Sequence, residues 1–269
     1  MLRLKCLRGI SATSFYARKC IKEQSKLFPV LPFQNPSQRS SCRFLDIYQI
    51  GNKEAIEKER ARLKDEMNRG YFADMAEMKQ HDGKIAMANK IVIPASAAAK
   101  FPMLEVCYSN GSSLKLPITS AGKDVNTPKL NVPKATLLCL SFRASSQTMV
   151  DSWSSPFLDT FGHSADVQLY EISLIDSWLL SRNPIKKLLL KIMRKPKPEG
   201  PKDVLQRQIV YSFGDNYYFR KELRILNLLT GYIFLLDKMG RIRWQGFGSA
   251  EQEELSSLLS CTSLLLDEK

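Results

Sequence analysis

Short hydrophobic runs of strand length recur along the chain from residue 101 onward. Residues 103–108 and 113–118 flank the sequence Ser-Asn-Gly-Ser, and Asn-Gly between two strand-like runs is a strong hairpin signal. Residues 135–142 form a continuous apolar run, which is typical of a strand covered on both faces. Residues 167–172 mix apolar and polar positions and predict the next strand.

Helical periodicity follows at residues 153–161 and, more clearly, at residues 183–195. In the second segment Asn183 can cap the helix, and Pro184 suits its first turn. The apolar positions then fall on one helical face: Ile185, Leu188, Leu189, Ile192 and Met193. Basic residues fill most of the remaining positions: Lys186, Lys187, Lys191, Arg194 and Lys195.

The end of the chain predicts a hairpin followed by a helix. Residues 231–237 form an apolar strand, Lys-Met-Gly makes a tight turn, and residues 241–244 return. Ser249 and Gln252 have the spacing of a capping box ahead of the last helix. The predicted order of elements from residue 101 is therefore β-β-β-α-β-α-α-β-β-α.

The region before residue 101 is predicted to be helical and highly charged. Residues 52–67 form a helix with a narrow apolar stripe of Ile56, Leu63 and Met67, and residues 71–78 form a second short helix. So thin a stripe buries little surface. The region is therefore either a solvated tether or a helix that docks on a partner.

The net charge of +13 is concentrated in two segments. Residues 1–43 hold nine Lys or Arg against one acid, with leucines between the first bases, which is typical of a mitochondrial presequence. Residues 182–224 hold twelve bases against four acids. We therefore predict a presequence at 1–43, a charged helical segment and linker at 44–100, and a folded domain at 101–269.

The cysteines and histidines predict no catalytic, cofactor or metal site. Three of the six cysteines lie in the predicted presequence, and Cys107, Cys139 and Cys261 are too far apart for a Cys-x-x-Cys motif. His81 and His163 are likewise too scattered to suggest a zinc site. The sequence also contains neither a phosphate-binding loop nor a nucleophile elbow.

The predicted final hairpin resembles that of thioredoxin-like and peroxiredoxin-like domains. The resemblance implies an α/β fold, a three-layer thioredoxin-like domain with an N-terminal hairpin. In that fold a catalytic cysteine pair follows the buried strand, at positions that fall here near Gln147 and Val150, where there is no thiol. Thr230, Gly231 or Tyr232 takes the place of the usual cis-proline. Because a serine alcohol cannot replace a thiolate, the domain is expected to be redox-inactive.

Several stretches together resemble the family of the mitochondrial ATP synthase assembly factor ten. These are Gly70-Tyr71-Phe72, Asp82-Gly83-Lys84, Phe101-Pro102, residues 230–237 and residues 242–248. The resemblance implies a peripheral protein on the matrix side of the mitochondrial inner membrane. Such a protein acts as a chaperone for the hydrophobic subunit a of the ATP synthase Fo sector and works with other Fo subunits. It implies no particular binding residues.

The basic helix near Pro184 is the candidate contact with a membrane or a client, through the apolar residues of its face together with Lys187, Lys191, Arg194 and Lys195. Apolar anchors with a cationic rim suit an anionic lipid surface, although a helix packed on the sheet would show a similar pattern. Two other functions stay open, a mitochondrial thiol oxidoreductase and a membrane-associated adaptor for another inner-membrane complex. Nucleic acid is not an expected partner, and phosphate binding would be steeply salt-dependent.

Overall fold

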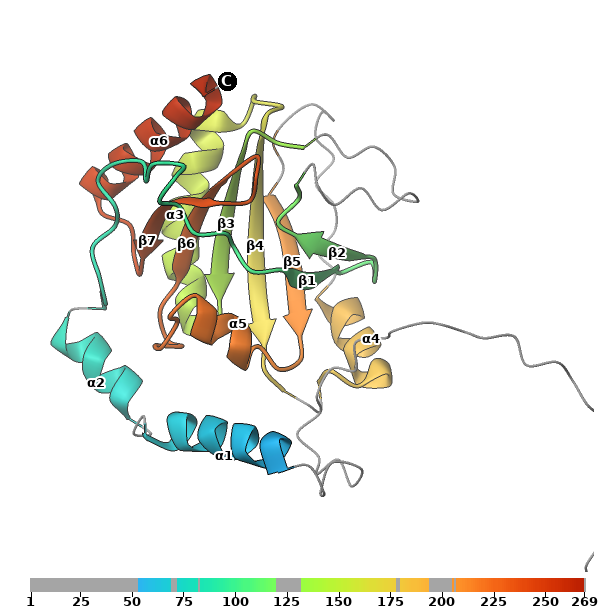
Figure 1. Ribbon diagram of the computed structural model, residues 1–269. Coiled ribbons are helices and arrows are strands. Elements are labelled where there is room, and N and C mark those ends of the chain that lie inside the picture. Colours follow the sequence, from blue (N-terminus) through green and yellow to red (C-terminus); the bar gives the residue numbers. More distant parts are fainter. Residues whose placement is uncertain are drawn as a thin grey trace, which may run out of the picture. The chain divides into compact units, whose positions relative to one another are not determined.

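A seven-stranded mixed sheet forms the centre of the computed structural model (Figure 1). The structure describes residues 53–68, 72–81, 83–119, 132–177, 180–193, 205 and 207–268. The strands are β1 (Leu104–Tyr108), β2 (Ser113–Leu116), β3 (Ala135–Ser141), β4 (Val167–Ile175), β5 (Arg207–Phe213), β6 (Tyr232–Asp237) and β7 (Ile242–Phe247). The helices are α1 (Lys53–Asn68), α2 (Ala73–Gln80), α3 (Gln147–Phe161), α4 (Asn183–Ile192), α5 (Tyr217–Glu222) and α6 (Gln252–Asp267), and the 3-10 turn η2 (Ala144–Ser146) precedes α3.

The strand order β2-β1-β5-β4-β3-β6-β7 is the thioredoxin-like and peroxiredoxin-like arrangement that the sequence predicts. Strands β3, β4 and β5 are parallel, whereas β6 pairs antiparallel with β3, and β7 with β6. The N-terminal hairpin of β1 and β2 joins the sheet beside β5. The predicted fold class is therefore confirmed.

Strand β3 is buried along its whole length because both faces of the sheet are covered. On one face Leu137 and Cys139 pack beneath α3 and α6, where Trp153 meets Trp244 edge to face at 5.5 Å between ring centroids. On the other face Leu138 belongs to a cluster that includes Phe101, whose ring meets Phe219 and Phe234 edge to face. The continuous apolar run in the sequence reflects this two-sided burial.

The predicted order of elements was wrong at β5, because it placed a second helix directly after the helix near Pro184. This strand begins with Arg207 and Gln208, which hide the apolar pattern of the residues that follow. In the sheet their polar groups have partners: Arg207 contacts Glu171, and Gln208 accepts a hydrogen bond from the Tyr108 hydroxyl at 2.7 Å. A central strand can therefore begin with polar residues when residues distant in the sequence supply partners for their side chains.

The predicted cap of the last helix was also displaced by two residues. The capping box of α6 is formed by Glu251 and Glu254, not by Ser249 and Gln252. Glu254 is buried there, because it also binds the segment that precedes β1. The predicted presequence lies outside the described residues and stays a prediction.

Candidate functional site

Three of the segments that carry the family resemblance meet around Gly248. Its backbone amide donates to the Gly231 carbonyl at 3.0 Å, and its carbonyl accepts from the Trp153 indole at 2.8 Å. A Cβ atom at position 248 would lie 3.0 Å from the Gly83 carbonyl oxygen, and the φ angle of +65° also favours glycine. The fold therefore brings residues 83–84, 230–237 and 242–248 to one place, which their spacing in the sequence does not reveal.

Lys84 connects this place to the start of α6. Its ammonium nitrogen lies 2.5 Å from Oε2 of Glu254 and 2.7 Å from Oε1 of Glu251. Burial disfavours the charged lysine, but the hydrogen bonds to the two carboxylates outweigh it and raise the pKa of Lys84 above its usual value. The other Glu254 oxygen accepts the backbone amide of Ala88 at 2.9 Å. Glu254 therefore fixes both ends of the segment 84–88.

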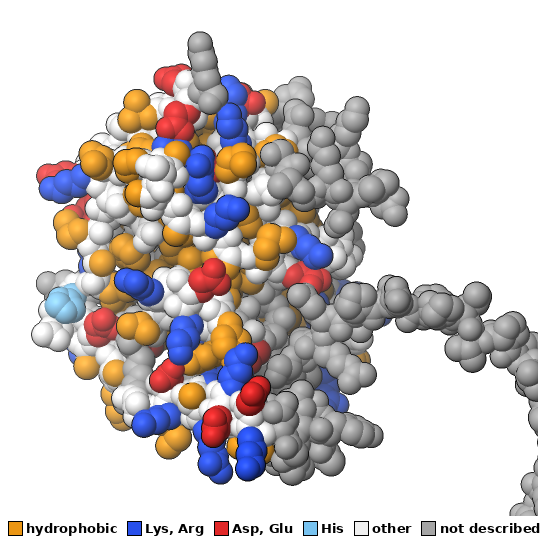
Figure 2. Space-filling view, viewed as in Figure 1, with side chains coloured by type: hydrophobic (Ala, Val, Ile, Leu, Met, Phe, Trp, Pro, Cys, Tyr) orange, Lys and Arg blue, Asp and Glu red, His pale blue; other side chains and the backbone are white. Residues whose placement is uncertain are grey.

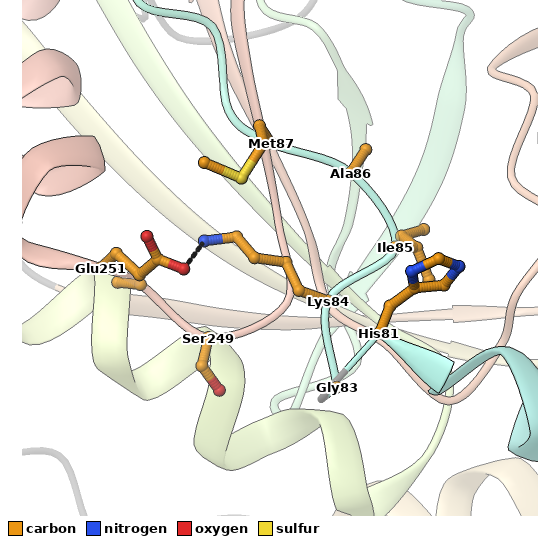
Figure 3. Close-up of a pocket in the computed structure, with 9 residues that line it drawn as sticks. His81, Gly83, Lys84, Ile85, Ala86, Met87, Ser249 and Glu251 are labelled. Carbon is orange, nitrogen blue, oxygen red and sulfur yellow. Dashed lines mark hydrogen bonds and ion pairs between the residues drawn. The ribbon is translucent and has the colours of Figure 1, made fainter. Parts of the chain in front are cut away.

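An open hollow of about 540 Å³ lies beside this ion pair (Figure 3). In Figure 3, Lys84 reaches toward Glu251, with Met87 and Ser249 beside them and His81 near Ile85. The lining residues are His81, Gly83, Lys84, Ile85, Ala86, Met87, Ser249, Ala250 and Glu251. Since the lysine is already held by two carboxylates, this arrangement clamps a chain segment and offers no free cation to an anionic ligand.

The start of α3 contains Gln147 and Val150, near which the sequence resemblance places the two thiols. Here the chain reads Ser145-Ser146-Gln147, and the Ser146 hydroxyl donates to the Arg143 carbonyl at 2.8 Å. The loop before β6 packs against this turn, because the Cβ position of Gly231 is 3.6 Å from the Ser146 carbonyl oxygen. The residues of this turn and of the first turn of α3 include no cysteine.

A polar cluster lies directly next to this turn. Arg207 contacts both Glu171 and Asp151, and the Gln147 amide donates to each of these carboxylates at 3.3 Å. Burial opposes the charged form of Arg207, but its hydrogen bonds to Glu171 and Asp151 outweigh this and raise its pKa. The cluster joins α3, β4 and β5, and two carboxylates share one guanidinium.

The cysteines of the described residues, Cys107, Cys139 and Cys261, are all free and buried. Burial is the main cause that raises the pKa of Cys139 well above the usual value, and the nearby Glu171 carboxylate adds to it. Burial also raises the pKa of the Cys261 thiol. Both changes oppose formation of the thiolate, which is the reactive form.

Helix α4 has the predicted amphipathic character, with one further buried residue. Leu188 and Ile192 are exposed beside the exposed Lys187 and Lys191, whereas the buried residue is Leu190. Three of the other predicted contact residues are partly buried, namely Ile185, Leu189 and Met193. Arg194 and Lys195 lie outside the described residues. Leu190 was absent from the predicted face because it lies on the opposite side from Leu188 and Ile192.

The part of the chain that the structure describes contains neither a membrane-spanning helix nor a metal-binding cluster. No helix there combines the length and apolar character needed to cross a bilayer. No group of three or more His, Cys, Asp or Glu side chains in that part of the chain is placed to hold a metal ion.

A sequence model of the ATP10 protein family matches residues 21–265 of the chain. No curated protein sequence matches it. Among solved structures, StoA from Bacillus subtilis is 16% identical with a TM-score of 0.35, covering 60% of this chain and 97% of StoA. A peroxiredoxin-like protein from Aquifex aeolicus is 8% identical with a TM-score of 0.37, covering 61% and 86% of the two chains.

Proposed function

The chain belongs to the ATP10 protein family of ATP synthase assembly factors, and from this premise we propose that it assists assembly of the Fo sector. The proposed client is the hydrophobic subunit a, together with other Fo subunits. The proposed place of action is the matrix side of the mitochondrial inner membrane. In this role the protein binds and protects a client and catalyses no reaction.

The start of α3 is the observation that supports a chaperone role best. The loop before β6 packs against the first turn of α3, and Gln147 and Val150 stand near the positions where the resemblance places the two thiols. Thiol exchange requires a thiolate at an accessible helix start. A retained scaffold with this substitution fits a protein that uses its surfaces for binding.

A thiol oxidoreductase remains the enzymatic alternative, with Cys139 or Cys107 as its candidate nucleophile. Burial disfavours that role for both residues, and Cys139 also has a raised pKa. An adaptor for another inner-membrane complex is the second alternative. The adaptor differs from the proposed function only in its client, so an experiment that measures which membrane complex fails to assemble distinguishes the two.

Helix α4 supplies the proposed membrane contact. Leu188 and Ile192 are exposed next to Lys187 and Lys191, and α4 contains no acidic residue. The opposite side of the helix is held to the domain, since Leu190 is buried and the Lys186 ammonium lies 5.1 Å from the centre of the Phe213 ring. Apolar side chains beside cations suit shallow insertion at an anionic lipid surface.

Depletion of the protein tests the proposed function directly. Newly made subunit a should remain outside the ATP synthase in depleted mitochondria, and native gel electrophoresis of pulse-labelled membranes would reveal it. A photocrosslinker at position 188 or 192 of the full chain should react with subunit a or with lipid. Normal ATP synthase assembly, accompanied by loss of a different inner-membrane complex, would favour the adaptor instead.

The membrane contact has its own test in a double variant, Leu188→Glu with Ile192→Glu. Both side chains are exposed, so the domain should keep its melting temperature while the protein leaves anionic vesicles in a flotation assay. Leu264→Glu, which alters an exposed leucine on α6, is the matched control. Unchanged flotation of the folded double variant would rule out α4 as the membrane contact.

A further inference from the structure

Helix α1 attaches to the domain through polar side chains. Arg62 is only 3% exposed, contacts Asp215, and places its guanidinium carbon 4.9 Å from the centre of the Tyr217 ring. One turn further along, Asp65 accepts hydrogen bonds from the Tyr217 hydroxyl at 2.8 Å and from Lys221 at 2.9 Å. The docked face of this helix is therefore its charged face.

The apolar stripe of α1 points away from these contacts. Ile56, Leu63 and Met67 are 37%, 50% and 81% exposed. At about 100° per residue they fall within an arc of roughly 40°, and its centre lies about 150° from the centre of the docked face. An isolated amphipathic helix normally buries its apolar stripe against its own domain. In α1 that relation is reversed.

Helix α2 shows the same reversal. The Asp74 carboxylate accepts the backbone amide of Leu228 at 3.0 Å, and the Asn227 amide donates to Glu77 at 2.9 Å. Met75 is half-exposed, and α2 has no buried residue. Two consecutive helices thus bind the domain with polar groups and leave apolar side chains outside.

A row of cations runs along one side of the apolar row of α1, and Glu59 lies along its other side. The cations are the exposed residues Lys53, Arg60 and Lys64. Each of them lies three residues before one member of the apolar row, which consists of Ile56, Leu63 and Met67. The two rows are therefore parallel and about 60° apart around the helix. In Figure 2, basic, acidic and hydrophobic side chains all appear along the lower edge of the molecule, where Figure 1 places α1.

The charges of α1 favour a protein partner over a lipid surface. The helix contains five basic and five acidic residues and is formally neutral, whereas α4 has no acid. Helices that lie on anionic membranes depend on an excess of cations. An apolar row with one cationic border instead complements a helix that has its own apolar row and a border of carboxylates. The flexible, strongly exposed Met67 can adapt to different apolar side chains.

We propose that the outward face of α1 is a docking surface for an α-helix of a protein partner, apolar on one side and bordered by acidic residues. The face from Ile56 to Met67 is about 16 Å long, which corresponds to three helical turns. In terms of the proposed function, on which this part rests, the partner is a helical segment of the client. Attachment through Arg62 and Asp65 holds the face outward, ready for binding.

Two synthetic helical peptides provide the test. Both carry leucines at the spacing of the α1 apolar row, and the adjoining row is glutamate in one peptide and lysine in the other. The full chain should bind the glutamate peptide more tightly in a fluorescence anisotropy titration. Leu63→Glu with Met67→Glu should weaken that binding at least about tenfold, because each buried side chain of this size contributes that much. Leu264→Glu on α6 should change nothing.

A charge exchange makes the test independent of any folding defect. Arg60→Glu with Lys64→Glu should reverse the preference, so that the lysine peptide binds better. Equal affinity for the two peptides, or an unchanged preference in this variant, would overturn the proposal. It would also be overturned if Leu63→Glu abolished binding to anionic vesicles or broke a dimer of this chain, since the occupant would then be lipid or a second copy. The titration does not involve ATP synthase, so its failure leaves the proposed function to the depletion experiment.

Discussion

Replacing Glu254 by Ala should loosen the segment before β1 and lower the free energy of unfolding by about 3 kcal/mol. The carboxylate accepts the Ala88 amide at 2.9 Å and the Lys84 ammonium at 2.5 Å. A hydrogen bond to a charged group contributes about 1.5 to 3 kcal/mol, and Lys84 keeps its second partner, Glu251. The lower end of that range for each bond gives the figure of about 3 kcal/mol.

Urea denaturation of the purified protein would measure this loss, and a thermal melt should fall by roughly 6 to 12 °C for a domain of this size. Limited proteolysis should in addition cut within residues 84–100 sooner than in the wild type. Glu253→Ala removes an exposed acid from the same turn of α6 and should cost less than about 1 kcal/mol. If both variants lost the same stability, the assignment of Glu254 as the anchor would be refuted.

Four further substitutions probe the fold. Burial opposes ionisation of Asp237, but hydrogen bonds from the β6–β7 turn lower its pKa below the usual value of 3.8. The ionised carboxylate therefore stabilises the protein fully above pH 3.8, and this contribution is lost as the pH falls further. Asp237→Asn should cost about 2 kcal/mol at pH 7 and flatten the acid decline in urea titrations, and an unchanged acid limb would contradict this. Gly248→Ala should lower the free energy of unfolding by at least about 1 kcal/mol, which a lower melting temperature would show. The reasons are the φ angle of +65° at Gly248 and its close approach to the Gly83 carbonyl oxygen. Leu190→Ala should lower the free energy of unfolding by about 2 to 5 kcal/mol, because Leu190 is buried, whereas Ile192→Ala at an exposed position should lower it by less than about 0.5 kcal/mol. Equal losses in urea titrations would show that α4 is oriented differently.

The sequence predicts those parts of the fold in which one face or both faces of an element are apolar. The hairpin ending at β2, the buried strand β3 and the final helix α6 all follow from local periodicity or turn residues. Strand β5 does not, because its first residues are Arg207 and Gln208. Their partners, Glu171 and Tyr108, lie far away in the chain, and single-sequence patterns contain no such pairing.

The orientation of α1 illustrates the same limit at a candidate site. Its apolar stripe is visible in the sequence, which left open a solvated tether or a helix that docks on a partner. The outward orientation of the stripe depends on Arg62 meeting Asp215 and Tyr217, about 150 residues further along the chain. The hollow at Lys84 was likewise missed, although Gly83 and Lys84, which line it, had carried part of the family resemblance.

Assembly of ATP synthase by a form of this protein that lacks the three cysteines of the described residues is the most direct test of the account. Cys107, Cys139 and Cys261 would be replaced together by Ala or Ser in the full chain, and the variant introduced into depleted cells. Native gel electrophoresis would measure assembled ATP synthase, and a thermal melt of the purified variant would establish that it is folded. The account predicts wild-type amounts of assembled enzyme. A folded variant that leaves subunit a unassembled would contradict it, because a thiol would then be required.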